Sequence, residues 1–369
     1  MTVKPAQSDL LYTEEEEALR SAVRSLLADR CDAAGVLART ESEHPHDRDL
    51  WKALAEGMGL AGLLVPETHG GQGATHREAA VVLEELGRAV APVPFLTSAV
   101  IATETLLACP GEEAADLLAA LASGRTVGGL AVPFANAPGP VRTPVRYSGG
   151  ALRGEVAGVA DAAVADILLV PTAEGLFAVD TGRDGVTVTP QTSLDRTRPL
   201  AAVTFDGAPA RRLAARAGTP VRTGLRAGAG LLASEQLGIA EWCLAETVRH
   251  TKERHQFNRP VGSFQALKHR LAKLWLDVVN TRAVARHAAD ALATGSDEPN
   301  LAAALAQAHA SPVAVRAAEE ALQLHGGIGM TWEHPVHLYL KRAKADSIGL
   351  GTAGQHKEAL AELVALPSP

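Results

Sequence analysis

The chain has 369 residues, a length that favours two or three domains and a large buried core. Its hydrophobic fraction of 47% and charged fraction of 21% are typical of a globular protein and argue against a disordered or fibrous one. The formal net charge is -7 and no long basic run occurs, which argues against a nucleic-acid partner. No apolar stretch approaches the roughly 20 residues that span a bilayer. The first residues do not resemble a signal peptide, and the three cysteines lie far apart. We therefore expect no membrane span, no metal site and a cytoplasmic protein.

The first third of the chain is predicted to be helical. Thr13 is a plausible N-cap, and the apolar residues after it recur with the period of a helix. A segment rich in glycine and proline, residues 59–73, is predicted to be a structured loop. The expected helices cover residues 14–29, 50–58, 77–88, 94–107 and 112–122. Together they predict an N-terminal helical domain over residues 1–124.

Short β-branched runs follow, and then the helical period returns. Runs at 126–132, 165–171, 175–179, 186–189 and 201–205 alternate with turn residues, which indicates a small antiparallel β domain over residues 125–213. Helices are expected at 223–252, 265–294, 301–324 and 335–347, within a C-terminal domain over residues 214–369. The predicted fold class is mainly α with a small central β domain.

Three passages are similar to one known family. They are residues 59–67 with 84–87, residues 252–265 with 268–269, and residues 323–333. Their order and separation resemble those of the acyl-CoA dehydrogenase family over nearly the whole chain, least clearly in the β domain. The resemblance implies an N-terminal helical domain, a middle antiparallel β domain, a C-terminal four-helix bundle and FAD as the cofactor.

The second passage carries the first candidate cofactor residues. Arg254 lies at the end of a predicted helix, and its guanidinium is permanently charged and suited to binding a phosphate. The alternative is that Arg254 stabilises the end of its own helix. The resemblance implies that Arg254 meets the FAD pyrophosphate across a subunit interface, with Gln256 and Phe257 beside the nucleotide. Asn258 stands where the family usually has glycine, and asparagine tolerates a left-handed turn.

Further cofactor residues are implied in the third passage and in two other places. The resemblance assigns Gln323, Gly326 and Gly327 to the adenosine half of an FAD that is bound mainly to the neighbouring subunit, and a helix C-cap explains the same glycines. Thr352 is expected at the flavin. Gly158 lies near the place of the family's flavin-shielding tryptophan, so contacts there would come from its backbone.

The base that the resemblance implies is missing. Leu350 occupies its usual position and cannot accept a proton, although its backbone N–H could still bind a thioester oxygen. A second position that some relatives use falls at Gly228. Glu235 lies two turns further along the same helical face and is the best remaining carboxylate. The alternative for Glu235 is a structural glutamate paired with a basic group.

Three functions are compatible with these residues. The leading hypothesis is flavin-dependent α,β-dehydrogenation of an acyl thioester, carried by coenzyme A or an acyl-carrier protein, with hydride passing to N5 of FAD. The second is a non-catalytic FAD-binding subunit of a heteromeric acyl-CoA dehydrogenase, and the third is a tailoring oxidase on the same scaffold. The expected partners are the acyl thioester and an electron-transfer flavoprotein or another acceptor. The expected assembly is a homodimer, a homotetramer or a heteromer with a related subunit.

Overall fold

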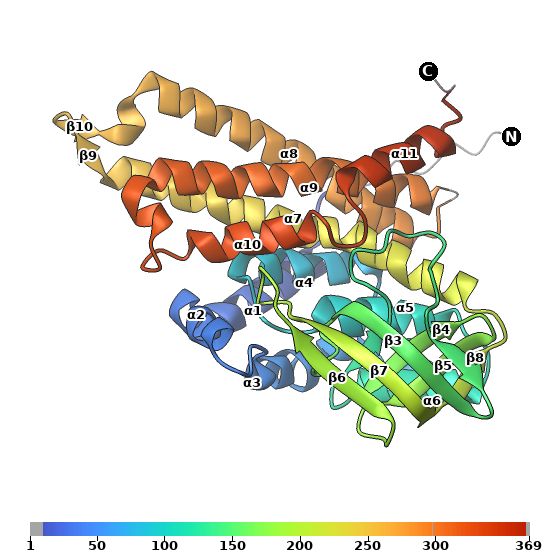
Figure 1. The fold of residues 1–369 in the computed structure, drawn as a ribbon. Helices are drawn as coiled ribbons and strands as arrows, with labels where there is room; N and C mark the ends of the chain where they lie inside the picture. The colour runs from blue at the N-terminus through green and yellow to red at the C-terminus, as the bar shows by residue number, and fades with distance from the viewer. Residues whose placement is uncertain (1–9, 297, 367–369) are drawn as a thin grey trace, which may run out of the picture.

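A computed structural model describes residues 10–296 and 298–366 of the chain. Figure 1 shows three long helices side by side, with the sheets and the N-terminal helices packed beneath them. The N-terminal helices are α1 (Glu14–Arg30), α2 (Ala33–Glu41), α3 (Arg48–Lys52), α4 (His76–Ala89), α5 (Thr103–Leu107) and α6 (Glu112–Ala122). The C-terminal helices are α7 (Gly218–Glu253), α8 (Gln265–Ala293), α9 (Pro299–His325), α10 (Val336–Asp346) and α11 (Ala353–Leu363).

The start of α1 shows how local sequence sets an element. The hydroxyl of Thr13 accepts from the N–H of Glu16, and the Glu16 carboxylate accepts from the N–H of Thr13, which satisfies two N–H groups at the helix start. Val23 and Leu27 are buried on one face of the helix. The helix predicted at 14–29 is therefore confirmed.

Two of the predicted N-terminal helices are partly π-helical. Residues Ala53–Gly57 (η1) continue α3, and residues Phe95–Ala102 (η4) run into α5. Such π segments are rare and often lie at functional sites. All eight residues of η4 are buried, at the contact between the N-terminal helices and the first β-strand.

The β domain consists of two four-stranded sheets. The first sheet has the order β1-β4-β5-β8 and the second the order β2-β3-β7-β6. The strands are β1 (Gly128–Leu130), β2 (Arg146–Ser148), β3 (Ala151–Ala160), β4 (Ile167–Thr172), β5 (Gly175–Asp180), β6 (Val186–Gln191), β7 (Leu200–Pro209) and β8 (Arg211–Ala214). Leu152, Phe177 and Phe205 are buried in one apolar cluster that both sheets share. The predicted small β domain is present and contains two sheets, and its strands are antiparallel except that β1 pairs with β4 in parallel.

Small residues allow the helices to approach one another closely. A Cβ on Gly238 of α7 would lie 2.0 Å from the carbonyl oxygen of Glu84, and one on Gly87 of α4 would lie 2.1 Å from the carbonyl oxygen of Glu235. No side chain fits at either place. The helices of the bundle pack around an apolar core of their own that is rich in alanine, including Ala240, Ala288, Ala306, Ala310, Ala314 and Ala317. This arrangement confirms the predicted fold class. Among the described residues, no helix is long and apolar enough to cross a membrane.

Candidate cofactor and acyl site

Six of the eight predicted cofactor residues lie at one end of the bundle, here called the bundle end: Arg254, Gln256, Phe257, Gln323, Gly326 and Gly327. Arg254 caps the C-terminus of α7, and Gly326 caps the C-terminus of α9. The rings of His250 and His325, each close to one of these caps, lie 4.3 Å apart, so the two helix ends are neighbours in one protomer. The side chain of Arg254 is exposed and makes no ion pair or hydrogen bond with any residue that the structure describes. A guanidinium without a partner at an exposed helix end is available to a ligand or another subunit.

A hairpin projects from this end of the bundle between α7 and α8 (Figure 1). Its strands β9 (His255–Gln256) and β10 (Arg259–Pro260) are joined by two residues, Phe257 at φ 54° and Asn258 at φ 63°. Positive φ at both central residues is the pattern of a tight type I′ turn. Asparagine tolerates this conformation, which confirms the expectation for Asn258. The turn leaves the Phe257 side chain 85% exposed.

Replacing Asn258 tests whether this turn sets the hairpin. Asn258→Val is expected to lower the free energy that holds the hairpin closed by about 1–2 kcal/mol, because a β-branched residue is strained at positive φ. The measurement is hydrogen exchange at the paired residues Gln256 and Arg259, which should speed up about 5- to 30-fold. Asn258→Gly is the matched control and should leave exchange unchanged or slower. Equal exchange in both variants would contradict the assignment of the turn.

The glycine turn after α9 has room for an external group. Gly326 has φ 65° and lies in open space, and Gly327 lies in open space as well, with no described atom within 4 Å of the place that a Cβ would take. The side chain of Gln323 is exposed one turn earlier, and its carbonyl accepts from the N–H of Gly326. The C-cap interpretation is therefore correct for Gly326. Packing within the chain does not explain the glycine at position 327.

The two positions where a base is expected face each other, and neither carries a carboxylate. A Cβ on Gly228 would lie 3.1 Å from Cδ1 of Leu350 and 2.7 Å from Ile101. The Leu350 side chain is buried and borders an apolar void of only about 20 Å³. Among the described residues, no acid lines this void. The space between positions 228 and 350 is therefore filled by the side chains of Ile101 and Leu350.

The backbone of Leu350 is already hydrogen-bonded within the chain. Its N–H donates to the carbonyl of Phe134 over 2.7 Å, and its carbonyl lies 2.9 Å from Nε2 of His356. The expectation that the Leu350 N–H binds a thioester oxygen is wrong for this conformation, because the loop after α10 is closed onto the β domain by that bond.

Glu235 is buried in a network of ion pairs and cannot serve as the base. One oxygen accepts from Arg198 over 2.6 Å and the other from Arg342 over 2.5 Å. Burial by itself would raise the pKa of Glu235, but the two guanidiniums outweigh it and lower the pKa to about 2. A carboxylate with both oxygens engaged and so low a pKa is a poor proton acceptor. The assignment of Glu235 as base is therefore wrong, and the alternative, a structural glutamate paired with basic groups, is correct.

The same network joins the β domain to the bundle. Arg198 follows β6, while Arg342 and Asp346 lie on α10; Arg198 also binds Asp346 over 2.7 Å, and Arg342 binds Asp195 over 2.8 Å. Burial and the nearby Glu235 raise the pKa of Asp346 well above its usual range. The network thus places three buried carboxyl groups around two buried guanidiniums, and each guanidinium contacts two of them. The network therefore has a structural role.

A larger cavity lies between the β domain and the loop after α10. It measures about 650 Å³ and is lined by Pro133, Phe134, Gly158, Ile348 and Gly349, among others. This volume is in the range of small-molecule and cofactor sites. The N–H of Gly158 donates to Oε1 of Gln191, and its carbonyl accepts from the N–H of Phe134. Gly158 thus borders the cavity. Its backbone N–H and carbonyl, which were predicted to contact FAD, are instead hydrogen-bonded to Gln191 and Phe134.

A second cavity of about 640 Å³ lies where α7 and α9 begin, along one side of α11. Arg222 and Arg226 line it, and within the described part of the chain neither forms an ion pair; Nε of Arg226 is also buried without a partner. Thr352 lies nearby as the N-cap of α11, in a capping box with Gln355. Its hydroxyl caps the helix, and its contact with the flavin stays a prediction.

A buried polar chain that the sequence did not indicate reaches the apolar void. The hydroxyl of Thr97, which borders the void, donates to Asp161 over 2.7 Å, and His46 lies 2.8 Å from the other oxygen of Asp161. The three residues come from separate parts of the chain, so no local motif signals them. Asp161 does not line the void itself, and Thr97 separates it from any ligand there.

Comparison with known proteins decides the family. Residues 13–125 match the acyl-CoA dehydrogenase N-terminal domain, and residues 219–365 match the acyl-CoA dehydrogenase C-terminal domain. The acyl-CoA dehydrogenase IpdE2 of Mycolicibacterium smegmatis is 38% identical over 92% of this chain and 95% of its own length. The chain belongs to the acyl-CoA dehydrogenase family. It is thus an FAD-dependent oxidoreductase.

Two solved structures of acyl-CoA dehydrogenases or their complexes are also similar. A variant of the steroid acyl-CoA dehydrogenase Tcur3481-Tcur3483 is 30% identical, with a TM-score of 0.85 over 95% of this chain and 98% of its own. The ChsE4-ChsE5 complex from Mycobacterium tuberculosis contains a chain that is 27% identical, with a TM-score of 0.87 over 98% of this chain and 100% of its own.

In this acyl-CoA dehydrogenase, the residues at the ends of α7 and α9 fit FAD, and the residues around Leu350 do not. The exposed Arg254 and the open glycine turn at Gly326 and Gly327 fit the anionic and nucleotide parts of a dinucleotide. The neighbourhood of Leu350 does not fit an acyl group lying beside a flavin ring, because its void is small and its N–H is bonded. Arg254 and the glycine turn thus face outward, and the void beside Leu350 is too small for an acyl group.

Proposed function

We propose that this chain is the subunit without a base in a heteromeric acyl-CoA dehydrogenase. A related subunit would carry the base and the acyl site, and this chain would contribute contacts to the FAD of that subunit. The proposal depends mainly on positions 228 and 350, which carry glycine and leucine and therefore no carboxylate. A Cβ at position 228 would lie only 3.1 Å from Cδ1 of Leu350, so the space between the two positions is filled. Because Glu235 is held by two arginines, it does not replace the missing group.

Exposed apolar side chains at the bundle end support a subunit interface. Phe257 is 85% exposed, Met330 74% and Trp332 63%, and all three lie beside Arg254 or the glycine turn in the chain. Trp275 and Leu276 are also exposed on α8, which leads away from the hairpin. Exposed aromatic and methionine side chains in such a group are typical of protein interfaces. The similar solved structures include one described as a complex of ChsE4 and ChsE5, which also supports a heteromer.

Each residue of the bundle end has a defined part in this proposal. The guanidinium of Arg254 would bind the pyrophosphate of FAD with charge-assisted hydrogen bonds. Gln323 and the backbone at Gly327 would contact the adenosine, and Phe257 would pack on the nucleotide. FAD, when bound, supplies the electron acceptor for α,β-dehydrogenation. This chain would bind and orient the cofactor, and the related subunit would remove the proton.

We infer that the substrate is an acyl-CoA, with a steroid-derived acyl group as the first class to test. The similar Tcur3481-Tcur3483 protein is a steroid acyl-CoA dehydrogenase, and the family model names acyl-CoA. Nothing in the bundle end selects the acyl group, since those residues would face the cofactor. An acyl-carrier protein is the alternative carrier to compare in the same assay.

Flavin content tests the proposal directly. The chain is produced alone and together with a family member from the same genome that has a glutamate at the base position. Alone, we expect it to purify without stoichiometric flavin. Together, we expect one complex that contains both chains, is yellow, and is bleached by an acyl-CoA in the absence of oxygen. The measurements are the flavin absorbance per chain, the mass of the complex and the rate of bleaching.

Two outcomes count against the proposal. If the chain alone is yellow and is bleached by an acyl-CoA, it is an active homo-oligomer with a base that lies elsewhere. If the co-produced chains do not associate, the heteromer is wrong for that pair. Removing the base glutamate of the related subunit is the matched control, and it should abolish bleaching while the yellow complex remains.

A further inference from the structure

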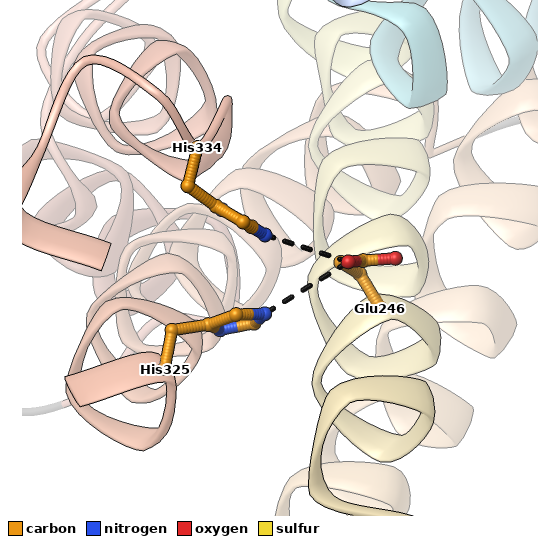
Figure 2. Close-up of side chains that lie close together, drawn as sticks. All are labelled: Glu246, His325 and His334. Atoms are coloured by element: carbon orange, nitrogen blue, oxygen red, sulfur yellow. Dashed lines mark ion pairs between the residues drawn. The ribbon is translucent and has the colours of Figure 1, made fainter. Parts of the chain in front are cut away.

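Three potential metal ligands converge beside the glycine turn. Glu246 lies on α7, His325 is the last residue of α9 and His334 lies just before α10, and Figure 2 shows the three side chains pointing toward one another. Nε2 of His334 is 3.4 Å from Oε1 of Glu246, and Nε2 of His325 is 3.9 Å from the same oxygen. The three ligand atoms all lie within 4.8 Å of one another. We propose that Glu246, His325 and His334 bind a divalent transition-metal ion, with Zn²⁺ as the best fit.

The distances suit a zinc ion placed between the ligand atoms. In tetrahedral coordination, ligands at about 2.0–2.2 Å from the metal lie about 3.3–3.6 Å from each other. The contact between His334 and Glu246 has this length already, the one between His325 and Glu246 is a few tenths of an ångström longer, and all three ligand atoms lie within 4.8 Å of one another. Two imidazoles and one carboxylate are a common zinc ligand set, which leaves a fourth position for water or another group.

His325 is the strongest single indication of a ligand. Its Nδ1 lies 2.6 Å from the carbonyl oxygen of Ala321, which can only accept, so Nδ1 carries the proton and Nε2 presents its lone pair. The side chain is fully buried, and Nε2 has no hydrogen-bond partner among the described residues. A lone pair therefore faces the Glu246 carboxylate, an arrangement that a cation between them would satisfy. A hydrogen bond from Nδ1 to a carbonyl also orients many metal-binding histidines.

The other two ligands are available, with two adjustments. The N–H of Val336 lies 3.3 Å from Nδ1 of His334, so binding through Nε2 requires a proton on Nδ1 and the loss of this long contact. Arg249 binds both oxygens of Glu246 over 2.5 and 2.9 Å, but its side chain is 57% exposed and can turn away.

The place of the site suggests its effect. The ligands flank the segment Gly326–Met330 (η6), which follows Gln323 and contains Gly327. A metal ion bound there would tie this turn to α7 through Glu246. The inference does not depend on the proposed function, because it concerns residues of this chain alone.

Zinc binding to the metal-free chain tests the inference. The protein is dialysed against EDTA and then titrated with Zn²⁺, with Mg²⁺ in parallel. We expect one Zn²⁺ per chain and a higher Tm with Zn²⁺ but not with Mg²⁺, and Co²⁺ should give the visible absorption of a tetrahedral site. His334→Gln should weaken Zn²⁺ binding at least about 10- to 100-fold, because even changes outside the ligand set cost that much.

His309→Gln is the matched control, since His309 lies on α9 away from the cluster and its loss should leave Zn²⁺ binding unchanged. His334 is used as the main variant because it is partly exposed, so its replacement disturbs folding less than that of the buried His325. The inference is overturned if the metal-free chain takes up no Zn²⁺, or if His334→Gln binds Zn²⁺ as tightly as the natural chain.

Discussion

Glu235→Gln is expected to lower the free energy of unfolding by about 3–5 kcal/mol, because it removes one partner from a buried set of ion pairs. Arg198 and Arg342 would each lose the carboxylate oxygen that they bind at 2.6 and 2.5 Å, because the neutral amide offers one acceptor oxygen and turns its NH2 group toward the other guanidinium. The measurement is denaturant unfolding at neutral pH.

The pH dependence gives the same prediction a second test. The pKa of Glu235 is about 2 in the folded chain against an ordinary value of 4.5, so its contribution to stability is complete above pH 4.5 and is lost as the pH falls toward 2. The difference in stability between the natural chain and Glu235→Gln should therefore be constant near neutral pH and shrink over that acidic range. A difference that grows toward low pH would contradict the ion-pair assignment.

Glu253→Gln is the matched control on the same helix. Glu253 pairs with Arg249 one turn away, and its side chain is 62% exposed. Exposed pairs at this spacing contribute about 0.3–0.5 kcal/mol. If Glu235→Gln were no more destabilising than Glu253→Gln, the buried network would not join the β domain to the bundle as described.

Arg254→Ala is expected to weaken FAD binding about 10- to 100-fold in the flavin-bearing complex, because a hydrogen-bonded charge is worth about 1.5–3 kcal/mol. The side chain is exposed and has no partner within the described residues, so the variant should fold and assemble normally. The measurements are the flavin retained after gel filtration, the Kd for FAD and the mass of the complex.

Lys252→Ala is the control for the loss of a positive charge. Lys252 is exposed two residues before Arg254 and also has no ion pair among the residues described. It should keep its flavin, and high salt should weaken FAD binding less in Arg254→Ala than in the natural chain, because one charge pair has been removed. Equal flavin retention in the two variants would place Arg254 outside the cofactor site.

Local sequence signals predicted most helices because those signals are complete within one segment. Thr13 with Glu16 predicts the start of α1, and the apolar period predicts α4 and α6. Strand β3 was missed because Gly154 and Gly158 interrupt its pattern, although Gly149 and Gly150 between β2 and β3 form a two-residue turn that the sequence could have indicated. Thr352 with Gln355 likewise signals the missed helix α11.

The sequence by itself determined the family, the absence of a carboxylate at position 350, and the residues of the bundle end, since each is a property of a short motif. Only the tertiary structure decided the role of Glu235. Its partners Arg198 and Arg342 lie 37 and 107 residues away, and no local pattern reports such contacts. The same holds for the group of Glu246, His325 and His334, which three separate segments bring together. Burial and charge balance depend on every chain segment that surrounds a side chain, so they appear only when the chain is folded.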